Sequence, residues 1–437
     1  MFYLAGDDTV DEIDSDMSGA IWRLERLSGN NTVRVVAQFD TAGTKGTRRF
    51  VVQPGGRYTE GVNQWSLGER NTGDPADLRA FTRWARENYP ANHYLLIVAG
   101  HGYGTDGIAY DDSSPDPSSV PPGQPSRIPV GKLGEALTAE DGLKLDVVFY
   151  DSCLMGLFEN AYEIKDQAQY LVVSQNISWT IFPYDRYLRQ VARNPEPEQL
   201  AQQIVQTYAN HEALNGIPGT PYTIAALNLN QADVLRSALD ELAEALIEVL
   251  GAHRNEIAAA RSAAQKFVTE DEDSDTRGFT DIEETDDYID LYDFAEQISR
   301  EFARYPDTTR VQTAAARVKA AVDGFVVAER HQPGHAVPVS NAFWNLSRAR
   351  GVSVYFPTTP TPQPNRNWDW FLDYLLYTDP VNDLFPSFEP DSQWDDFVRL
   401  YNLNAIVRRP RGISRAPFRP PLLRIHLPAV QREFVRR

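Results

Sequence analysis

The sequence contains one cysteine among 437 residues. A single thiol excludes both an internal disulfide framework and a metal site built from several cysteines. No run of 18 apolar residues occurs, so we expect no membrane insertion. The start, "MFYLAGDD", leaves no room for a charged and then apolar signal peptide. As it stands, the sequence predicts a cytoplasmic protein, or a secreted one if the true start lies upstream.

Positive charge is scarce: the chain has 42 lysines and arginines but 61 aspartates and glutamates, which gives a formal net charge of −19. This balance argues against a nucleic-acid-binding protein. The charge is also uneven, because residues 408–437 hold nine arginines and one glutamate. An acidic body attracts cationic partners over long range. Simple solubility explains the same composition, and both interpretations remain open.

Strand-like and helix-like segments alternate along the first half of the chain. Such alternation predicts an α/β fold, with a mostly parallel sheet flanked by helices on both faces. The expected strands are Phe2–Ala5, Val33–Phe39, Arg49–Val52, Tyr94–Ala99, Val147–Tyr150 and Tyr170–Ser174. The expected helices are Pro75–Asn88, Val130–Leu137, Leu157–Ala168 and Glu198–Glu212.

The second half of the chain is richer in helical patterns. After a strand near Tyr222–Leu229, we expect long helices through 231–267 and 291–326 and a strand at 351–357. These patterns predict a core at 1–230 and a helical subdomain at 231–404, whose strand near 351–357 returns to the core. Residues 405–437 are rich in Arg and Pro and predict an arm outside the core.

One strand ends in a histidine held between glycines, in "HYLLIVAGHGYGTDG" at 93–107. Gly102, Gly104 and Gly107 spell G-x-G-x-x-G after a strand, which suggests a nucleotide-binding enzyme. That interpretation needs a helix opening at the glycines. The five prolines in 108–127 exclude such a helix. His101 is therefore the more interesting residue of this turn.

The only cysteine also follows a strand, in "LDVVFYDSCLMG" at 145–156. The carboxyl ends of strands in an open α/β sheet form the edge where ligands bind. His101 and Cys153 at that edge could form a base and a nucleophile. Taken singly, Cys153 could be a small buried hydrophobe and His101 a turn residue bonded to backbone. Their shared position at strand ends favours the catalytic interpretation.

The motifs "AGHGYG" and "DSCLMGLFENAYEI" resemble those of the clostripain-like (C11) cysteine peptidases of the caspase-hemoglobinase superfamily. The likeness extends to "YLAGDD", "VVAQFD", "YLVVSQ", "YIDLYDFA" and "GVSVYFP", and so spans about residues 2–380. It departs from the family in the arginine-rich tail and in "QNISWTIFPY" after Ser174. The resemblance implies a caspase-like fold and a cysteine endopeptidase. A catalytically silent binding module of the same fold is the rival interpretation.

The resemblance also implies roles for individual residues. Cys153 would be the nucleophile and His101 the proton carrier, and the N–H groups of Gly102 and Cys153 would form the oxyanion hole. Asp151 and Ser174 would lie in the S1 pocket, where the aspartate selects Arg or Lys at P1. A carboxylate is indeed well matched to a guanidinium or an ammonium. Alternatively, Asp151 caps a helix starting near Leu154, with Ser152 as the rival cap.

Family members mature by cleavage between the two motifs, which implies self-processing here. The polar, proline-rich stretch 111–127 has the composition of an exposed loop and ends at Arg127. We expect cleavage after Arg127, with Lys132 and Lys144 as alternatives. A passive surface loop would have the same composition.

Residues 270–290 hold eleven carboxylates, which usually indicates a solvated loop. Oxygen ligands suit Ca²⁺, and clostripain-like enzymes can respond to it, so calcium is a second interpretation of this segment. His331 and His335 cannot share a helix face across "QPG", which argues against zinc there. We expect a monomer that acts on peptides or proteins and requires no cofactor.

Overall fold

The computed structural model describes residues 1–7, 13–26, 33–42, 46–115, 125–139, 142–216, 219–268, 281–284, 286–336, 342–358 and 384–407. Within these residues, five parallel strands form the middle of a nine-stranded sheet, in the order β13-β10-β9-β8-β5-β1-β2-β3-β4. Antiparallel strands close both edges. The strands are β1 Phe2–Gly6, β2 Val36–Thr41, β3 Thr47–Val51, β4 Gln64–Gly68, β5 Leu95–Ala99, β8 Leu145–Asp151, β9 Ala168–Val173, β10 Tyr222–Asn228 and β13 Val326–Gln332.

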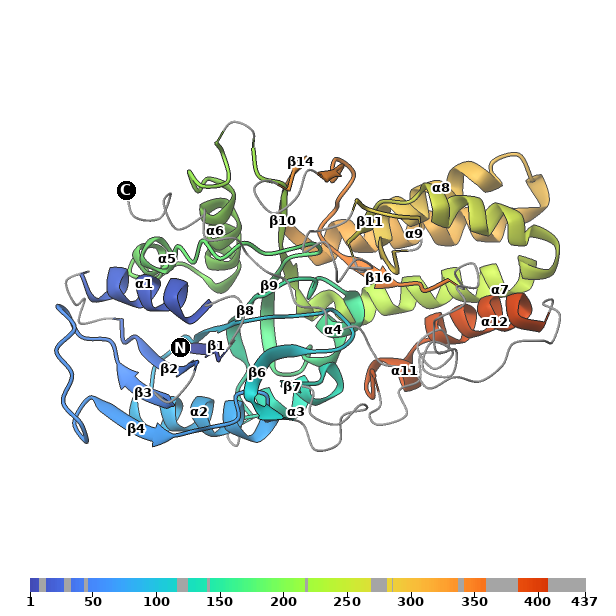
Figure 1. The fold of residues 1–437 in the computed structure, drawn as a ribbon. Helices are drawn as coiled ribbons and strands as arrows, with labels where there is room; N and C mark the ends of the chain where they lie inside the picture. Colours follow the sequence, from blue (N-terminus) through green and yellow to red (C-terminus); the bar gives the residue numbers. More distant parts are fainter. Residues whose placement is uncertain are drawn as a thin grey trace, which may run out of the picture.

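The central strands are buried on both faces, as continuous apolar runs predict for a parallel sheet covered by helices. Figure 1 shows helices on both sides of the sheet, α1, α5 and α6 on one and α2 and α3 on the other. The core helices are α1 Ile13–Glu25, α2 Pro75–Asn88, α3 Leu133–Leu137, α4 Phe158–Glu163, α5 Tyr184–Val191 and α6 Pro197–Ala209. Short 3₁₀ turns lie at Val130–Lys132, Leu229–Gln231 and Pro306–Thr308.

Helix α2 illustrates how local sequence determines these elements. The Asp74 side chain accepts a hydrogen bond from the N–H of Ala76, and a proline occupies the first turn. The helix then buries Leu78, Phe81 and Ala85, which lie on one face at helical spacing. Burying a large apolar side chain such as leucine or phenylalanine contributes about 1.5–3 kcal/mol.

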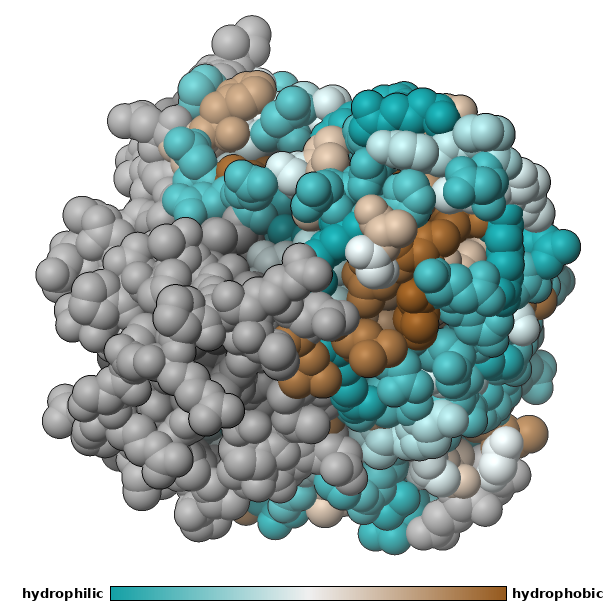
Figure 2. All heavy atoms as spheres, turned by 90° about the vertical axis from the view of Figure 1, so that its right-hand side faces the viewer, coloured by the Kyte–Doolittle hydropathy of each residue, from teal (hydrophilic) through white to brown (hydrophobic). Residues whose placement is uncertain are grey.

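A second group of helices extends beyond the sheet and packs together (Figure 1). It comprises α7 Ala232–Ala263, α8 Leu291–Phe302, α9 Thr309–Phe325, α11 Phe388–Asp391 and α12 Trp394–Val407. The minor strands are β6 Ile108–Pro115, β7 Pro125–Ile128, β11 Lys266–Phe267, β12 Tyr288–Asp290, β14 Gly334–His335, β15 Phe343–Trp344 and β16 Ser353–Tyr355. Figure 2 shows an apolar patch on this end of the molecule, with hydrophilic surface where described residues adjoin it. No described helix has the length and apolar character needed to cross a bilayer.

The predicted fold class is confirmed: the central sheet is mostly parallel and flanked by helices. The predicted helix at 291–326 is wrong in detail, because the chain turns at Pro306 and gives α8 and α9 instead. The predicted helix at Leu157–Ala168 ends early, at Glu163. Strand β13 lies beyond the predicted boundary at residue 230 and yet belongs to the central sheet. The arginine-rich segment 408–437 lies outside the described residues.

Strand β16 contacts the segment between β8 and α4. Ser353 forms a parallel bridge with Leu157, and its N–H donates to the carbonyl of Gly156 at 2.8 Å. The glycine turn after β5 opens into strand β6 and not into a helix. The helix N-terminus that the nucleotide interpretation requires is therefore not formed there.

Candidate active site

The candidate base and nucleophile follow two strands that pair in register. Strands β5 and β8 are parallel neighbours, and Ala99 at the end of β5 faces Asp151 at the end of β8. His101 lies two residues beyond Ala99, and Cys153 lies two residues beyond Asp151. The ladder therefore brings both side chains to the same edge of the sheet, as strand-end position predicted.

Gly102 brings the two turns into contact. A Cβ atom at this position would lie 2.8 Å from the carbonyl oxygen of Cys153 and 2.9 Å from the Cβ of Ser152. Only glycine allows this approach, because both neighbours belong to a buried turn. The close packing of the histidine turn on the cysteine turn explains the glycine.

The amide of Gly102 is oriented by a bridge to β6. Gly102 pairs with Ile108 in an isolated antiparallel bridge. The flanking hydrogen bonds run from Ala109 N–H to His101 O and from Tyr103 N–H to Gly107 O, both at 3.0 Å. In such a pair the two facing residues direct their own N–H groups away from each other. The amide of Gly102 is thus directed away from β6.

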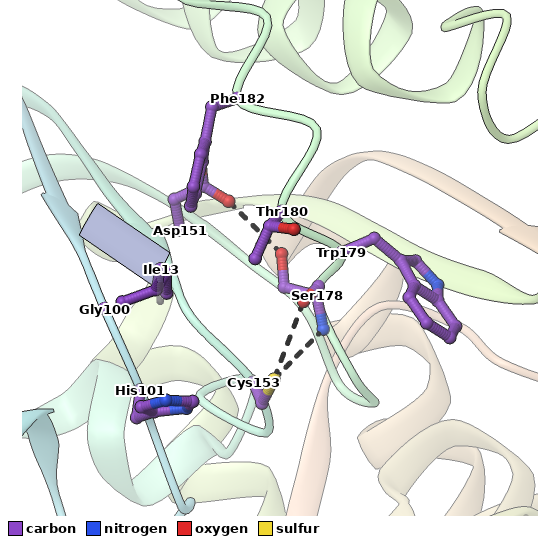
Figure 3. A pocket seen from close by; sticks show the side chains of 9 residues that line it. All are labelled: Ile13, Gly100, His101, Asp151, Cys153, Ser178, Trp179, Thr180 and Phe182. Carbon is purple, nitrogen blue, oxygen red and sulfur yellow. Dashed lines mark hydrogen bonds between the residues drawn. The ribbon is translucent and has the colours of Figure 1, made fainter. Parts of the chain in front are cut away.

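Figure 3 shows the pocket that these turns border. His101 and Cys153 lie at one end, and Asp151 lies toward the other end, with Ser178 between it and Cys153. The pocket encloses about 330 Å³ of empty space, including the part open to solvent. It is lined by Ile13, Gly100, His101, Asp151, Cys153, Ser178, Trp179, Thr180 and Phe182.

The sulfur of Cys153 has two backbone contacts with the same residue. It accepts a hydrogen bond from the N–H of Ser178 at 3.4 Å and donates to the carbonyl of Ser178 at 3.6 Å. A backbone N–H donor stabilises the thiolate, which is the nucleophilic form of the side chain. The loop after β9 therefore holds the thiol at the pocket wall.

The imidazole of His101 is held by aromatic packing. Its ring stacks on Tyr103 with centroids 6.1 Å apart and planes inclined by 12°. Tyr103 in turn packs edge-on against Tyr110 of β6. The hydroxyl of Tyr110 donates to Asp106, so the turn is connected to the β6–β7 hairpin. These contacts restrict the directions in which the ring can point.

Asp151 is buried, with 3% of its surface exposed, and is only partly satisfied. The hydroxyl of Ser178 donates to its Oδ1 at 3.2 Å, whereas Oδ2 has no hydrogen-bond partner. Burial raises the pKa of Asp151 to about 7. The nearby hydroxyl of Tyr184 opposes that rise, although it does not reach hydrogen-bond geometry with the carboxylate.

Neutral hydroxyls surround this carboxylate. Burial, and next the charge of Asp151, raises the pKa values of Tyr184, Tyr187 and Tyr208, so all three stay protonated at neutral pH. An orphaned carboxylate oxygen in such a pocket is best satisfied by a cationic group. The helix-cap interpretation of Asp151 and Ser152 is wrong, because α4 begins only at Phe158 and its N-cap is Leu157.

The structure does not bring Ser174 to the pocket. Its hydroxyl donates to the carbonyl of Thr223 at 2.8 Å and pairs with the hydroxyl of the same residue at 2.9 Å, and both side chains are buried. Ser178, four residues later, supplies the serine that lines the pocket. The stretch "QNISWTIFPY" departs from the pattern of the resembled family. Its sequence did not lead us to expect Ser178, Trp179 or Thr180 in the wall of the pocket.

Arg127 does not lie in an open loop. It belongs to β7, and its guanidinium forms a 2.6 Å ion pair with Asp106 and donates to the Asp106 carbonyl at 3.1 Å. Only 15% of its side chain is exposed. Lys132 is half exposed, and Lys144 donates to the carbonyl of Lys165. Residues 116–124 of the expected loop, and 270–280 and 285 of the acidic segment, lie outside the described residues.

Comparisons with known proteins agree with this geometry. The sequence model of the Clostripain family, Peptidase_C11, matches residues 2–403. Clostripain of Hathewaya histolytica is 31% identical over 140 residues, which cover 29% of this chain and 26% of that protein. The chain therefore matches about a quarter of the length of this relative.

Two solved structures share the fold over most of their length. An inactive zymogen of a C11 protease from Parabacteroides distasonis has a TM-score of 0.57 at 16% identity, with 91% of this chain and 96% of that chain covered. A secreted C11 cysteine protease from Bacteroides thetaiotaomicron, in complex with an irreversible peptide inhibitor, has a TM-score of 0.57 at 14% identity. That match covers 89% of this chain and 97% of the other.

Proposed function

Because the chain belongs to the clostripain family of cysteine peptidases, we propose that it hydrolyses peptide bonds after Arg or Lys with a His101–Cys153 dyad. One observation carries this proposal. The β5–β8 register brings His101 and Cys153 to a single pocket, and the buried carboxylate of Asp151 lines the same pocket. No other described cluster combines a thiol with an imidazole, since Cys153 is the only cysteine.

In the proposed mechanism, the Cys153 thiolate attacks the scissile carbonyl carbon. The carbon–sulfur bond forms while the carbonyl electrons move to oxygen. The N–H groups of Gly102 and Cys153 donate to this oxyanion, and removing one such donor typically costs about 3 kcal/mol of transition-state stabilisation. The orientation of the Gly102 amide away from β6 supports this role.

His101 then protonates the leaving amine as the carbon–nitrogen bond breaks. The imidazole next accepts a proton from water, which attacks the acyl-enzyme and releases the new carboxyl terminus. The second step regenerates the thiolate and the protonated imidazole. An imidazole serves both steps because its ordinary pKa is close to neutrality. Every group comes from one chain, so the mechanism requires neither a second copy nor a cofactor.

Specificity is proposed to come from Asp151. Its unpartnered Oδ2 and its raised pKa show that the free pocket leaves the carboxylate poorly solvated. A guanidinium or ammonium at P1 would supply the missing donor and return the carboxylate to its ionised form. We therefore propose peptides or proteins with a basic P1 residue as substrates.

Self-processing between the two motifs is also proposed, with Arg127 as the first candidate and Lys132 and Lys144 as alternatives. The description of the Parabacteroides distasonis structure as an inactive zymogen supports the idea that family members are made as precursors. In this chain Arg127 is paired with Asp106, so cleavage there requires β7 to separate from its neighbours.

The proposal is tested with peptides that differ only at P1, carrying Arg, Lys, Asp or Phe. The purified chain should cleave the Arg and Lys peptides, and the Cys153→Ala and His101→Ala variants should cleave none. Ser152→Ala is the matched control, because the hydroxyl of Ser152 is buried without a partner. Better cleavage after Asp or Phe, or full activity of Cys153→Ala, would refute the proposal.

A further inference from the structure

Four carboxylates from four separate elements converge beside the central sheet. Asp7 follows β1, Asp40 lies in β2, Glu69 follows β4 and Asp111 lies in β6. One oxygen from each residue lies within 4.8 Å of the others. None of these residues lines the pocket of Cys153, and none belongs to the acidic segment 270–290. The positions of these residues in the sequence, 7, 40, 69 and 111, follow no metal-binding spacing.

Two buried carboxylate oxygens of these residues have no hydrogen-bond partner. Asp7 and Asp40 are 1% and 0% exposed. Asp7 accepts the N–H of Ser113 on Oδ2 at 3.2 Å, and Asp40 accepts the hydroxyl of Thr47 on Oδ1 at 2.8 Å. Their remaining oxygens, Oδ1 of Asp7 and Oδ2 of Asp40, are buried and unpaired. Such atoms cost free energy unless a cation or a donor satisfies them.

The cluster also lacks a compensating positive side chain. Among the described residues, no Lys or Arg forms an ion pair with Asp7, Asp40, Glu69 or Asp111. Four anionic groups this close are stable only with bound protons or with a cation.

We propose that Asp7, Asp40, Glu69 and Asp111 bind one divalent cation, with Ca²⁺ preferred over Mg²⁺. The donors are all oxygens, which are the ligands of both ions. Ca²⁺–oxygen distances of about 2.3–2.6 Å allow opposite ligands to lie up to about 5 Å apart, whereas Mg²⁺ at about 2.1 Å requires a tighter set. The four oxygens all lie within 4.8 Å of one another, which satisfies the limit for Ca²⁺.

The cation would fasten β6 to the sheet. Asp111 is the ligand from β6, and the same strand binds the end of β1 through the bond from Asp112 N–H to Asp7 O. Strand β6 also holds the histidine turn, through Ala109 N–H to His101 O and the bridge from Ile108 to Gly102. Metal binding at the cluster would thus rigidify the turn that carries the candidate base.

The test uses the full chain carrying Cys153→Ala, which removes self-cleavage, after treatment with a chelator. Calorimetric titration with CaCl₂ should give about one site per chain, with MgCl₂ binding more weakly. Saturating Ca²⁺ should raise the Tm by several degrees, because a ligand that binds only the folded state stabilises it. Neither measurement depends on peptidase activity, so failure here leaves the proposed function standing.

The key variant is Asp40→Asn in the same background. It should bind Ca²⁺ at least about tenfold more weakly, since a charged ligand becomes a neutral one. Without metal it should unfold at or above the Tm of its parent, because a buried repulsion is removed. Asp146→Asn is the control. Asp146 lies in β8 and is not one of the four proposed ligands, so this variant should keep the calcium response. Glu69→Gln alters the exposed ligand and replaces Asp40→Asn if that variant does not fold.

Three results would overturn the proposal. The first is the absence of both calcium heat and a Tm change in the parent chain. The second is an unchanged affinity in Asp40→Asn or Glu69→Gln, which would place the bound ion elsewhere, for example in the segment 270–290. The third is tighter binding of Mg²⁺ than of Ca²⁺.

Discussion

His101 and Cys153 each lie two residues beyond a pair of facing residues, Ala99 and Asp151, in the parallel β5–β8 ladder. The hydrogen-bond register of two buried strands, rather than the conformation of a long loop, thus determines how the turns are placed. Gly102 then packs against the carbonyl of Cys153 and fixes the distance between the turns. The candidate dyad is therefore built on two buried strands in the middle of the sheet.

Replacing the pocket carboxylate should change specificity more than folding. We expect Asp151→Asn to lower kcat/KM for Arg peptides by about ten- to a hundredfold, since a charge-assisted bond contributes about 1.5–3 kcal/mol. The amide keeps an acceptor for Ser178, so the pocket should retain its shape. Kinetics with Arg and uncharged P1 peptides measure the effect. Asp146→Asn, on the same strand, is the control, and equal losses in both variants would contradict the assignment.

The raised pKa of Asp151 predicts how stability depends on pH. Burial raises this pKa from 3.8 to about 7, so the folded state holds the proton more tightly than the unfolded state does. This contribution to stability is full below about pH 4 and is lost as the pH rises through 7. Asp151→Asn should therefore be more stable than its parent at pH 8, and the difference should shrink toward pH 5. Thermal unfolding of both proteins in the Cys153→Ala background tests this, and a constant difference would argue against it.

A methyl group at Gly102 should separate the two turns. Its carbon would lie 2.8 Å from the carbonyl oxygen of Cys153, and backbone must move to relieve the contact. We expect Gly102→Ala to lower kcat at least about tenfold, because misplaced catalytic groups lose rate steeply. Gly251→Ala is the control, since nothing lies near its Cβ position. Wild-type kcat in Gly102→Ala would show that the close packing does not matter.

Self-processing should depend on the Arg127–Asp106 ion pair. If the chain cuts itself after Arg127, then Asp106→Asn should speed cleavage several-fold by freeing the arginine from β7. Intact-mass analysis over time should show a fragment of residues 1–127 in the parent and none in Cys153→Ala. Cleavage after Lys132 or Lys144 would identify that lysine, and not Arg127, as the processing site. A fully active enzyme that stays in one piece would exclude self-processing.

Much of the site could be predicted from local sequence, because strand ends are local features. The apolar runs before His101 and Cys153 predicted two buried strands, and parallel strands bring their carboxyl ends together. Helix α2 was predicted with its observed bounds, Pro75–Asn88, since a capping aspartate and a proline mark its start.

The remaining features depend on tertiary structure. The ligands Asp7, Asp40, Glu69 and Asp111 come from elements far apart in sequence, so no spacing connects them. The choice between Ser174 and Ser178 depends on the path of the chain after β9, which no local pattern determines. The stretch that ends at Arg127 looked like an open loop because of its prolines. Its two ends nevertheless pair as β6 and β7, as prolines can do in edge strands.

Covalent labelling tests the central claim most directly. An arginine-directed acyloxymethyl ketone, which alkylates the nucleophile of an enzyme that accepts Arg at P1, should modify the full chain once. Peptide mass mapping should place the label on Cys153. Labelling should be absent from Cys153→Ala, slowed at least about tenfold in His101→Ala, and unchanged in Ser152→Ala. A label on any other residue, or equal labelling by a matched probe with Asp at P1, would contradict the account.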